Sequence, residues 1–372
     1  MKSTVAGTWT ALVATAALWV GSQIHAQAGA DPLSSAVQHA LEFAAQRLDA
    51  ATRSIATNRY SYLTGSSGAW TTTDASAWTS GFFPGCLWLM YDWSGDAAWR
   101  TDGAAWLVAL EGQKNDTSTH DVGFKIFPSF GNAYRLTGTD SQRLVVLTGA
   151  GSLATRYSSI VGCIRSWNGP TSSDFRVIID NMMNLEILFW GAQHGGNQTW
   201  TSMAINHALK TRENHVRADA STYQLVNYSP TTGAVKDRGT HQGYDDESTW
   251  ARGQAWAVYG FTMCYRETGD ARFLDTARRT ADYFVAHLPA DSVPYWDFEL
   301  PSTQGEPRDT SAGAVAASGL LELAQVEPDA QRAGSTLEAA RRILTSLTSP
   351  AYLSEETSNA CLLYTSPSPR DS

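Results

Sequence analysis

Two aspartates stand out as candidates for acid–base chemistry because of where they lie. Asp121 is in the segment His120–Phe124, after the polar stretch 112–119, and Asp180 directly follows two isoleucines. We expect each aspartate where a polar loop gives way to an apolar helix. Aspartate also caps helix N-termini, so a purely structural role is the alternative for each. A carboxyl group near aromatic and apolar surfaces has a raised pKa and can act as a general acid near neutral pH, as glycoside chemistry requires.

The familiar motifs of nucleophilic, metal and nucleotide chemistry are missing from the sequence. It contains no H-E-x-x-H, C-x-x-C or G-x-S-x-G pattern, and no P-loop or Rossmann glycine pattern. The carboxylates therefore carry the predicted chemistry. We expect no metal ion and no cofactor.

A third segment, 240–256, combines short polar residues with arginine and tryptophan. Ser248 and Thr249 are typical of a helix start, after which Arg252 and Trp256 lie four apart on one helical face. Such a pair suits a carboxylated sugar ring, because the guanidinium binds the carboxylate and the indole stacks on the ring. The alternative is a stacked pair inside a helix interface.

Three segments with the pattern Tyr-x-x-x-Gly indicate helical hairpins. They start at Tyr91, Tyr134 and Tyr265, and each follows one apolar helical run and precedes another. Glycine after the last turn and Asp or Thr before the next helix are stop and start signals. The starting points are 43 and 131 residues apart, and 131 is close to three times 43. A repeat of about 44 residues predicts stacked helix pairs.

The predicted fold is all-α. Alternating strand patterns are scarce, and residues 223–228 and 293–298 are expected to be short extended pieces in loops. Six helix pairs can close into an (α/α)6 toroid around a central cavity, and a solenoid is the alternative. No interior linker is rich in Pro, Gly or Ser, so we expect one catalytic domain over residues 29–360.

Composition and charge limit the classes of partner. The chain has 372 residues, of which 43% are apolar and 17% charged, so it is globular with a sizeable core. The formal charge of −9, with no basic cluster longer than Arg341–Arg342, argues against nucleic acid as a partner. The 14 tryptophans outnumber the 12 phenylalanines and are either sugar platforms or fillers of helix interfaces.

Residues 1–28 have the pattern of a secretory signal peptide. Met1–Lys2 precedes the apolar run Ala11–Val20 and a small-x-small cleavage pattern that ends at Ala28. We therefore expect export, to the periplasm or outside the cell. The apolar run is too short to span a bilayer and no later run is longer, so no membrane span is expected. The few, widely separated cysteines are expected to be buried thiols rather than bridges.

The end of the chain, residues 361–372, is predicted to be a non-native tail. Residues 364–372 have no apolar periodicity and look like a translated sequencing adapter, whereas 361–363 can be genuine. We predict that the true C-terminus is missing and that the last hairpin is incomplete. The expected consequences are an exposed apolar seam between the first and last helices and reduced stability.

Taken together, the motifs resemble those of the unsaturated glucuronyl hydrolases, glycoside hydrolase family 88. The resemblance runs in order from about residue 35 to about residue 350, through Trp78–Gly85, His120–Phe124, Ile178–Leu185, Thr240–Trp256, Tyr295–Phe298 and Arg308–Ser311. It implies an (α/α)6 toroid. It also implies that the partner is a small unsaturated oligosaccharide, from whose non-reducing end a 4,5-unsaturated uronic acid is removed. The oligomeric state is left open.

The resemblance also implies roles for individual residues. The unsaturated uronate is a vinyl ether, so an acid can protonate C4 and water can add at C5. By motif, Asp180 matches this acid and Asp121 its assisting carboxylate. Seven residues match substrate-pocket positions, namely Trp78, His120, Trp167, Gln224, Gln242, Arg252 and Trp256. Gln224 stands where the family commonly has histidine, so polar contacts to the unsaturated ring are expected to be rearranged.

Three other functions are alternatives to this one. An unsaturated rhamnogalacturonyl hydrolase shares the toroid and the chemistry, and a non-catalytic sugar-binding toroid shares the fold. A sugar 2-epimerase needs paired histidines, but the histidines other than His120 are expected on helix surfaces or in loops. The parent polysaccharide, whether chondroitin, hyaluronan, heparin, gellan or xanthan, is not predicted.

Overall fold

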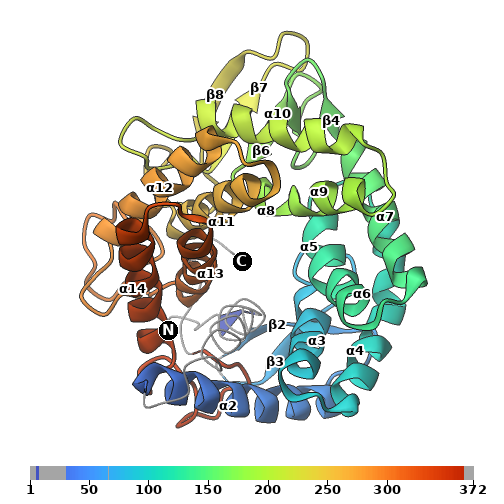
Figure 1. Ribbon diagram of the computed structural model, residues 1–372, viewed down its shortest axis with the longest axis vertical. Helices are drawn as coiled ribbons and strands as arrows, with labels where there is room; N and C mark the ends of the chain where they lie inside the picture. The colour runs from blue at the N-terminus through green and yellow to red at the C-terminus, as the bar shows by residue number, and fades with distance from the viewer. Residues whose placement is uncertain (1–5, 8–30, 66, 364–372) are drawn as a thin grey trace.

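The helices form a ring, which confirms the predicted all-α toroid (Figure 1). The computed structural model describes residues 6–7, 31–65 and 67–363. Most of the predicted signal peptide and the predicted tail from residue 364 onward lie outside these described residues. Figure 1 shows an inner and an outer layer of helices, and the chain passes back and forth between them, with some of its inner passages broken into two or more short helices.

Each layer of the ring contains helices from the whole length of the described chain. The inner layer contains α3 (Phe82–Ser94), α5 (Val122–Ile126), the π-helical turn η3 (Phe127–Gly131), α6 (Asn132–Thr137), α8 (Asn181–Asn184), α9 (Glu186–Gln193), α11 (Ala251–Thr268) and α13 (Thr310–Val326). The outer layer contains α2 (Pro32–Ser54), α4 (Ala97–Leu110), α7 (Asp140–Ala154), α10 (Thr199–Asn214), α12 (Ala271–Ala286) and α14 (Ala330–Leu347). Packing of α11 against both α12 and α13, and of α13 against α14, shows how successive pairs are stacked.

The three predicted hairpin turns are present, but the predicted cap is missing at the second, where the Thr139 side chain makes no capping hydrogen bond to α7. Gly95, Gly138 and Gly269 end α3, α6 and α11 in the left-handed conformation, with φ of 71°, 66° and 67°. Glycine adopts this conformation without a steric penalty, so the chain reverses there. Asp96 and Asp270 then cap the next helices, each accepting a 2.9 Å hydrogen bond from a backbone N–H in the first turn.

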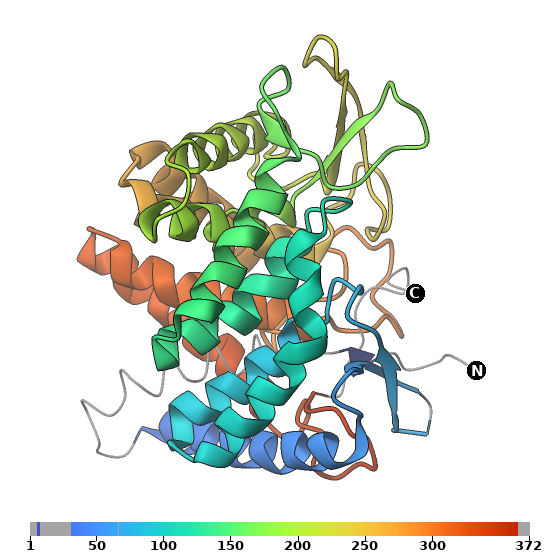
Figure 2. The same cartoon turned by 90° about the vertical axis from the view of Figure 1, so that its right-hand side faces the viewer.

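The strands form three small antiparallel sheets in the connections between helices. One consists of β1 (Ala6–Gly7), β2 (Tyr60–Thr64) and β3 (Trp70–Thr73), another of β4 (Tyr157–Ser158) and β5 (Cys163–Ile164), and the third of β6 (Phe175–Ile178), β7 (Leu225–Tyr228) and β8 (Val235–Gly239). The β2–β3 hairpin and the β7–β8 hairpin extend from the same end of the ring (Figure 2). Strand β7 lies in the first predicted extended piece, and the second, 293–298, forms isolated antiparallel bridges at Tyr295 and Asp297.

Sheet β6–β8 matters most because it leads into the inner ring. The segment before Asp180 was expected to be a loop, but it is strand β6, paired with β7 in the register Val177 to Val226. Phe175 and Val177 are buried in a small core of their own, with Tyr228 among its members. Burial of this strand fixes where α8 begins.

Helix α2 packs against α14, so the first and last described helices are neighbours. The side chain of Arg341 lies 2.6 Å from Asp31, and Arg47 donates to the carbonyls of Ser354 and Thr357. The expected exposed apolar seam is not found among the described residues. Their large exposed apolar side chains belong to separate segments, namely Val108, Leu144, Ile160, Tyr244 and Leu337.

The cysteines are all free and buried, which confirms the prediction of buried thiols; they are Cys86, Cys163, Cys264 and Cys361. Leu362 and Leu363, at the start of the predicted tail, lie in the main hydrophobic core. In the described part of the chain, every helix is too short or too polar to cross a bilayer.

Candidate active site

Asp121 lies at the start of α5, and residues just before it hold its side chain. Its Oδ2 accepts a 2.6 Å hydrogen bond from the Thr119 hydroxyl, and its Oδ1 lies 3.2 Å from Nε2 of His120. The carboxylate caps no backbone N–H of α5. The capping alternative is therefore wrong for Asp121.

Asp180 lies at the start of α8, directly after the strand end and Ile179. Its side chain is 7% exposed, makes no capping hydrogen bond, and has an Oδ2 without a hydrogen-bond partner. The backbone N–H of Ile179 donates to the carbonyl of Gln224, so the strand pairing continues up to the aspartate. The capping alternative is wrong here too. A buried carboxyl oxygen without a hydrogen-bond partner destabilises the folded state, so its presence here calls for a functional explanation.

A close contact between α5 and α8 sets the spacing of the two aspartates. A Cβ atom on Gly123, two residues after Asp121, would lie 2.2 Å from Oδ1 and 2.8 Å from Cβ of Asn184. Asn184 is four residues after Asp180, on the same helical side. The absence of a side chain at residue 123 therefore lets the two short helices approach.

The surroundings of the two carboxyl groups push their pKa values apart. Burial raises the pKa of Asp180 to about 7, against the opposing effect of His120 and Arg252, and the charge of Asp121 adds to the rise. Burial also disfavours ionisation of Asp121. The proximity of His120, the hydrogen bonds to it and to Thr119, and the charge of Lys125 outweigh that burial, so the pKa of Asp121 is lowered. Near neutral pH, one carboxyl group is ionised and the other is poised to hold a proton.

Aromatic side chains enclose one side of this pair. Phe124 has four aromatic neighbours, with ring centroids 5.5 Å from Trp78, 5.8 Å from Phe82, 6.5 Å from His120 and 5.3 Å from Trp256. Trp256 and His120 are buried, whereas Trp78 and Trp167 are partly exposed. Trp256 therefore fills a helix interface, and the partly exposed tryptophans are the ones that can offer a face to a sugar.

Gln224 organises a loop. Its Oε1 accepts hydrogen bonds from the Thr240 hydroxyl at 2.6 Å and from the backbone N–H groups of His241 at 2.7 Å and Gln242 at 2.9 Å. Its Nε2 donates to the side-chain oxygen of Gln242. The predicted pair Gln224 and Gln242 is thus brought together, with the first positioning the second. The same loop places the ring of His241 5.0 Å from that of Trp167.

Arg252 is buried in an ion pair. Its Nη1 lies 2.7 Å from Oδ2 of Asp309, and its guanidinium lies 4.3 Å from the ring centroid of Trp250. Asp309 also caps α13 through the Ala312 N–H. The expectation that Ser248 and Thr249 begin the helix is wrong. Helix α11 begins at Ala251, and those two side chains instead bond Asp297 and Glu299.

Two histidines expected on the surface are in fact fully buried. Nδ1 of His207 accepts a hydrogen bond from the Ile164 N–H, and Nε2 of His215 lies 3.1 Å from the Val177 carbonyl. Burial lowers the pKa of His207 to about 3 and that of His215 to about 4, so both are neutral. Each ring contacts the backbone of β5 or β6, so these two histidines do not form an epimerase-like pair at the aspartates.

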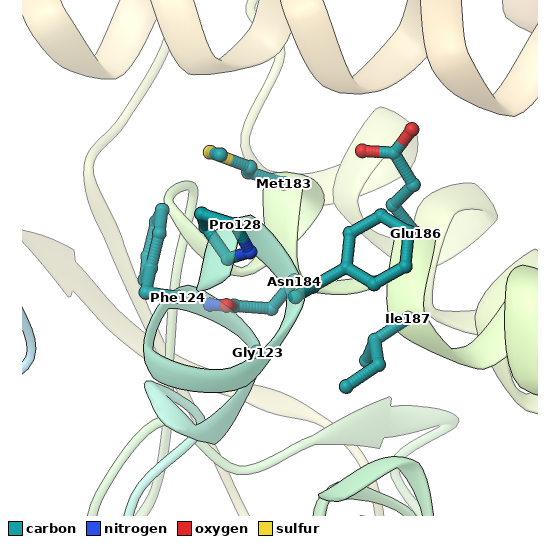
Figure 3. A pocket seen from close by; sticks show the side chains of 8 residues that line it. Gly123, Phe124, Pro128, Met183, Asn184, Glu186 and Ile187 are labelled. Carbon is teal, nitrogen blue, oxygen red and sulfur yellow. The ribbon is translucent and has the colours of Figure 1, made fainter. Parts of the chain in front are cut away.

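A small pocket lies between α5, η3, α8 and α9 (Figure 3). Phe124, Met183 and Ile187 supply apolar walls, and the Asn184 side chain lies between Phe124 and Ile187 in this view. None of the nine predicted site residues lines this pocket, so it is distinct from the predicted substrate pocket. Among the described residues, no group of three or more His, Cys, Asp or Glu side chains is placed to hold a metal ion.

Comparison with known proteins identifies the family. No family model matches the chain. Its sequence is 43% identical over 287 residues to the unsaturated glucuronyl hydrolase of Formosa agariphila, an alignment that covers 76% of this chain and 70% of that protein. The chain belongs to the unsaturated glucuronyl hydrolase family. It is also 37% identical to the unsaturated glucuronyl hydrolase of Bacillus sp. strain GL1, with 78% of each covered.

Solved structures of unsaturated glucuronyl hydrolases share this ring. A crystal structure of one specific for heparin is similar with a TM-score of 0.85 at 36% identity, covering 90% of each chain. These comparisons confirm the predicted family, fold and enzyme class. The chain is a glycoside hydrolase of unsaturated glucuronyl substrates, which decides against the epimerase and the non-catalytic binding protein.

Three residues beside the pair were missed in the sequence. Lys125 is a single charged residue within the apolar helix α5, and that isolation was a usable signal. Asn184 follows Asp180 by one helical turn, which was also readable. His241 had no such signal, because its place depends on hydrogen bonds of the 240–242 loop.

Proposed function

We propose that this chain removes a 4,5-unsaturated uronic acid from the non-reducing end of oligosaccharides released by polysaccharide lyases, with Asp180 as the general acid. One observation carries the assignment of the acid. Asp180 is buried with a free Oδ2 and a pKa raised to about 7, beside an Asp121 whose pKa is lowered. Two neighbouring carboxyl groups with separated pKa values are the arrangement expected of acid–base catalysis.

The chemistry needs one proton donor that can take the proton back. Asp180 protonates C4 of the vinyl ether, and the positive charge develops at C5 and the ring oxygen. Water then adds its oxygen to C5 and returns a proton to the Asp180 carboxylate. The resulting hemiketal opens and releases the sugar on C1. No covalent enzyme intermediate forms, which fits the lack of a nucleophile motif.

Asp121 assists in two ways in this proposal. Its negative charge raises the pKa of Asp180 and so keeps the proton on the acid before reaction. It also favours the positively charged transition state, because opposite charges attract strongly in a buried site. Trp78, Trp167 and Gln242 supply stacking faces and a polar contact for the substrate.

Substrates named for solved relatives support the shared first unit. One relative, with a TM-score of 0.83 and 32% identity, is described with dGlcA-Glc-Rha-Glc, and another, with a TM-score of 0.74 and 29% identity, with dGlcA-GalNAc6S. Both ligands begin with dGlcA, and the sugars that follow differ. We infer that the unsaturated glucuronyl unit is what this site recognises, and that glycosaminoglycan disaccharides are its substrates.

We also propose that the protein is exported. The support is the charged start Met1–Lys2, the apolar run Ala11–Val20 and the cleavage pattern before residue 29. Mass measurement of the mature protein from its source cells tests this. A mature chain beginning near residue 29 in the periplasm or medium is expected, whereas an uncleaved cytoplasmic chain would contradict export.

The decisive experiment follows the ultraviolet absorbance of an unsaturated chondroitin disaccharide, because hydration removes the absorbing double bond. The protein and its Asp180→Asn variant are compared, with turnover expected in the first alone. In heavy water, one deuterium should appear at C4 of the product, as seen by NMR. Turnover by Asp180→Asn would remove Asp180 from the acid's role, and action on unsaturated rhamnogalacturonan fragments alone would favour the runner-up substrate.

A further inference from the structure

Lys125 is a fully buried cation one helical turn after Asp121, and the mechanism above does not use it. Its side chain is 0% exposed, yet its Nζ has three acceptors within reach. They are Oδ2 of Asp116 at 2.6 Å, Oε1 of Gln113 at 2.9 Å and the carbonyl of Ser76 at 3.3 Å. An ammonium group has three N–H donors, so this site satisfies all of them.

The first two acceptors belong to the loop that leads into His120 and Asp121. Asp116 accepts, through Oδ1, hydrogen bonds from the Ser118 N–H at 2.8 Å and the Ser118 hydroxyl at 2.6 Å. The next residue, Thr119, donates to Asp121. A continuous set of contacts therefore runs from the Lys125 ammonium through Asp116 to the Asp121 carboxylate.

The third acceptor belongs to a different segment. Ser76 lies two residues before Trp78, one of the half-buried tryptophans beside Phe124. Lys125 thus connects two separate chain segments that lead to the site, 111–119 and 74–80, to helix α5. Helix α7 and the residues after it hold the first of these segments from the other side, since Arg156 Nη1 donates to the Thr117 carbonyl at 2.5 Å.

The charges near Asp121 come from every element packed around it. His120 and Lys125 lie on its own segment, Arg156 follows α7, and Asp180 faces it from α8, with Asp116 beyond Lys125. The cations favour ionised Asp121 and the two other carboxylates oppose it. Lys125 is the positive charge that opposes the negative charge of Asp116, so its removal leaves Asp116 unpaired and the surroundings of Asp121 more negative by one charge.

We propose that Lys125 is a positioning residue for Asp121, which holds the loop before the aspartate in place and supplies the buried charge that keeps this carboxylate ionised. The inference rests on the proposed function, because it acts through the pair Asp121 and Asp180. Its two parts have separate consequences. Loss of positioning lowers kcat/KM at every pH, and loss of charge moves the acidic limb of the pH profile.

The test compares Lys125→Met with the control Lys114→Met, measuring kcat/KM for the chondroitin disaccharide from pH 3 to 8. Lys114 lies on the same loop but pairs with Glu111 at the surface, so its removal should change neither quantity. For Lys125→Met we expect about a tenfold fall in kcat/KM, and an acidic limb that rises by a few tenths of a pH unit. The alkaline limb, set by Asp180, should stay in place.

Asp116→Asn separates the two parts and covers the case in which Lys125→Met fails to fold. It releases the loop but leaves the cation, which is then unneutralised, so kcat/KM should fall about tenfold while the acidic limb stays or moves to lower pH. Opposite movements of the limb in the two variants would exclude a merely structural role. If Lys125→Met does not fold, a folded Lys125→Arg with the native acidic limb is expected.

The outcomes distinguish this inference from the proposed function. An unchanged acidic limb in folded Lys125→Met, or an acidic limb raised in Asp116→Asn, would overturn the inference alone. A native protein without turnover on any unsaturated glucuronyl substrate would instead overturn the proposed function. Secondary structure is checked by circular dichroism at each pH, so that acid unfolding is not mistaken for a catalytic limb.

Discussion

The starts of α5 and α8 place the same side chain, an aspartate, in opposite surroundings. At α5, Asp121 has a hydroxyl donor, a histidine and a buried lysine within its range. At α8, Asp180 follows a buried strand and leaves one oxygen without a partner. Polar neighbours stabilise the first as an anion, whereas burial favours the neutral acid in the second. The difference shows that the protonation of each carboxyl group is decided by burial and by the side chains around it, which come from the connections and from the helices.

The connections explain how such a difference arises within one ring. Asp121 is preceded by a polar loop rich in donors, and Asp180 by strand β6, whose backbone groups are already paired with β7. A strand residue thus reaches the ring with no free polar neighbours of its own. The acid therefore has no hydrogen-bond partner at Oδ2, and its burial outweighs the opposing charges of His120 and Arg252.

Asp180→Asn removes one side of the comparison and should have the largest effect. We expect turnover to fall by a factor of about 10³ or more, because the proposed proton donor for C4 is lost. The same substitution should increase the free energy of unfolding. Since the pKa of Asp180 is about 7 when folded and 3.8 in an ordinary setting, the folded state gives up stability as pH rises through that window.

The gain from Asp180→Asn should reach about 4 kcal/mol above pH 7 and vanish below pH 4. Melting curves at several pH values measure it. Asp329→Asn is the matched control, because Asp329 caps α14 at the surface and asparagine caps equally well. A variant with no gain at high pH would show that the pKa of Asp180 is not raised in the folded protein.

Asp121→Asn removes the other side and should lower kcat by a factor of about 10²–10³. Without the negative charge, the pKa of Asp180 falls, so the alkaline limb of the pH profile should move to lower pH. Residual turnover from pH 4 to 9 gives this limb. A limb that stays at its native position would mean that the two carboxyl groups do not interact.

Gly123→Ala tests the spacing between the two starts. The added Cβ would overlap Asn184, so α5 and α8 must separate, and we expect a fall in kcat of about 10–100-fold with about 1–3 kcal/mol lost from the free energy of unfolding. Gly112→Ala is the control, since a Cβ there meets nothing within 4 Å. If Gly123→Ala were fully active, close approach of these helices would be irrelevant to catalysis.

The sequence predicted the ring and both carboxylates because these depend on local signals. Hairpin turns with Gly95 and Gly269 are encoded within a few residues, and the motifs around Asp121 and Asp180 lie on continuous segments. What was missed depends on residues far apart in the chain. Strand β6 is stabilised by pairing with residues about 50 positions later, and the role of Gln224 depends on a loop that begins at Thr240.

Electrostatic partners were equally hard to foresee. Arg252 pairs with Asp309, 57 positions away, and Lys125 finds Ser76, 49 positions before it. Side-chain spacing on a helix gives the direction of Arg252 but not what it meets. The predicted pairing with a substrate carboxylate therefore has to share this guanidinium with Asp309.

Thr119→Val makes the smallest change to the comparison, because it removes one hydroxyl and keeps the shape. The hydroxyl donates to Asp121 Oδ2 at 2.6 Å and accepts from the Asp121 N–H at 3.2 Å. Losing a donor to the anion raises the pKa of Asp121, so the acidic limb should rise by a few tenths of a pH unit, with kcat/KM about two- to fivefold lower. Thr119→Ser keeps the donor and should match the native profile. Equal profiles for the Val and Ser variants would mean that Lys125 and His120 alone keep Asp121 ionised.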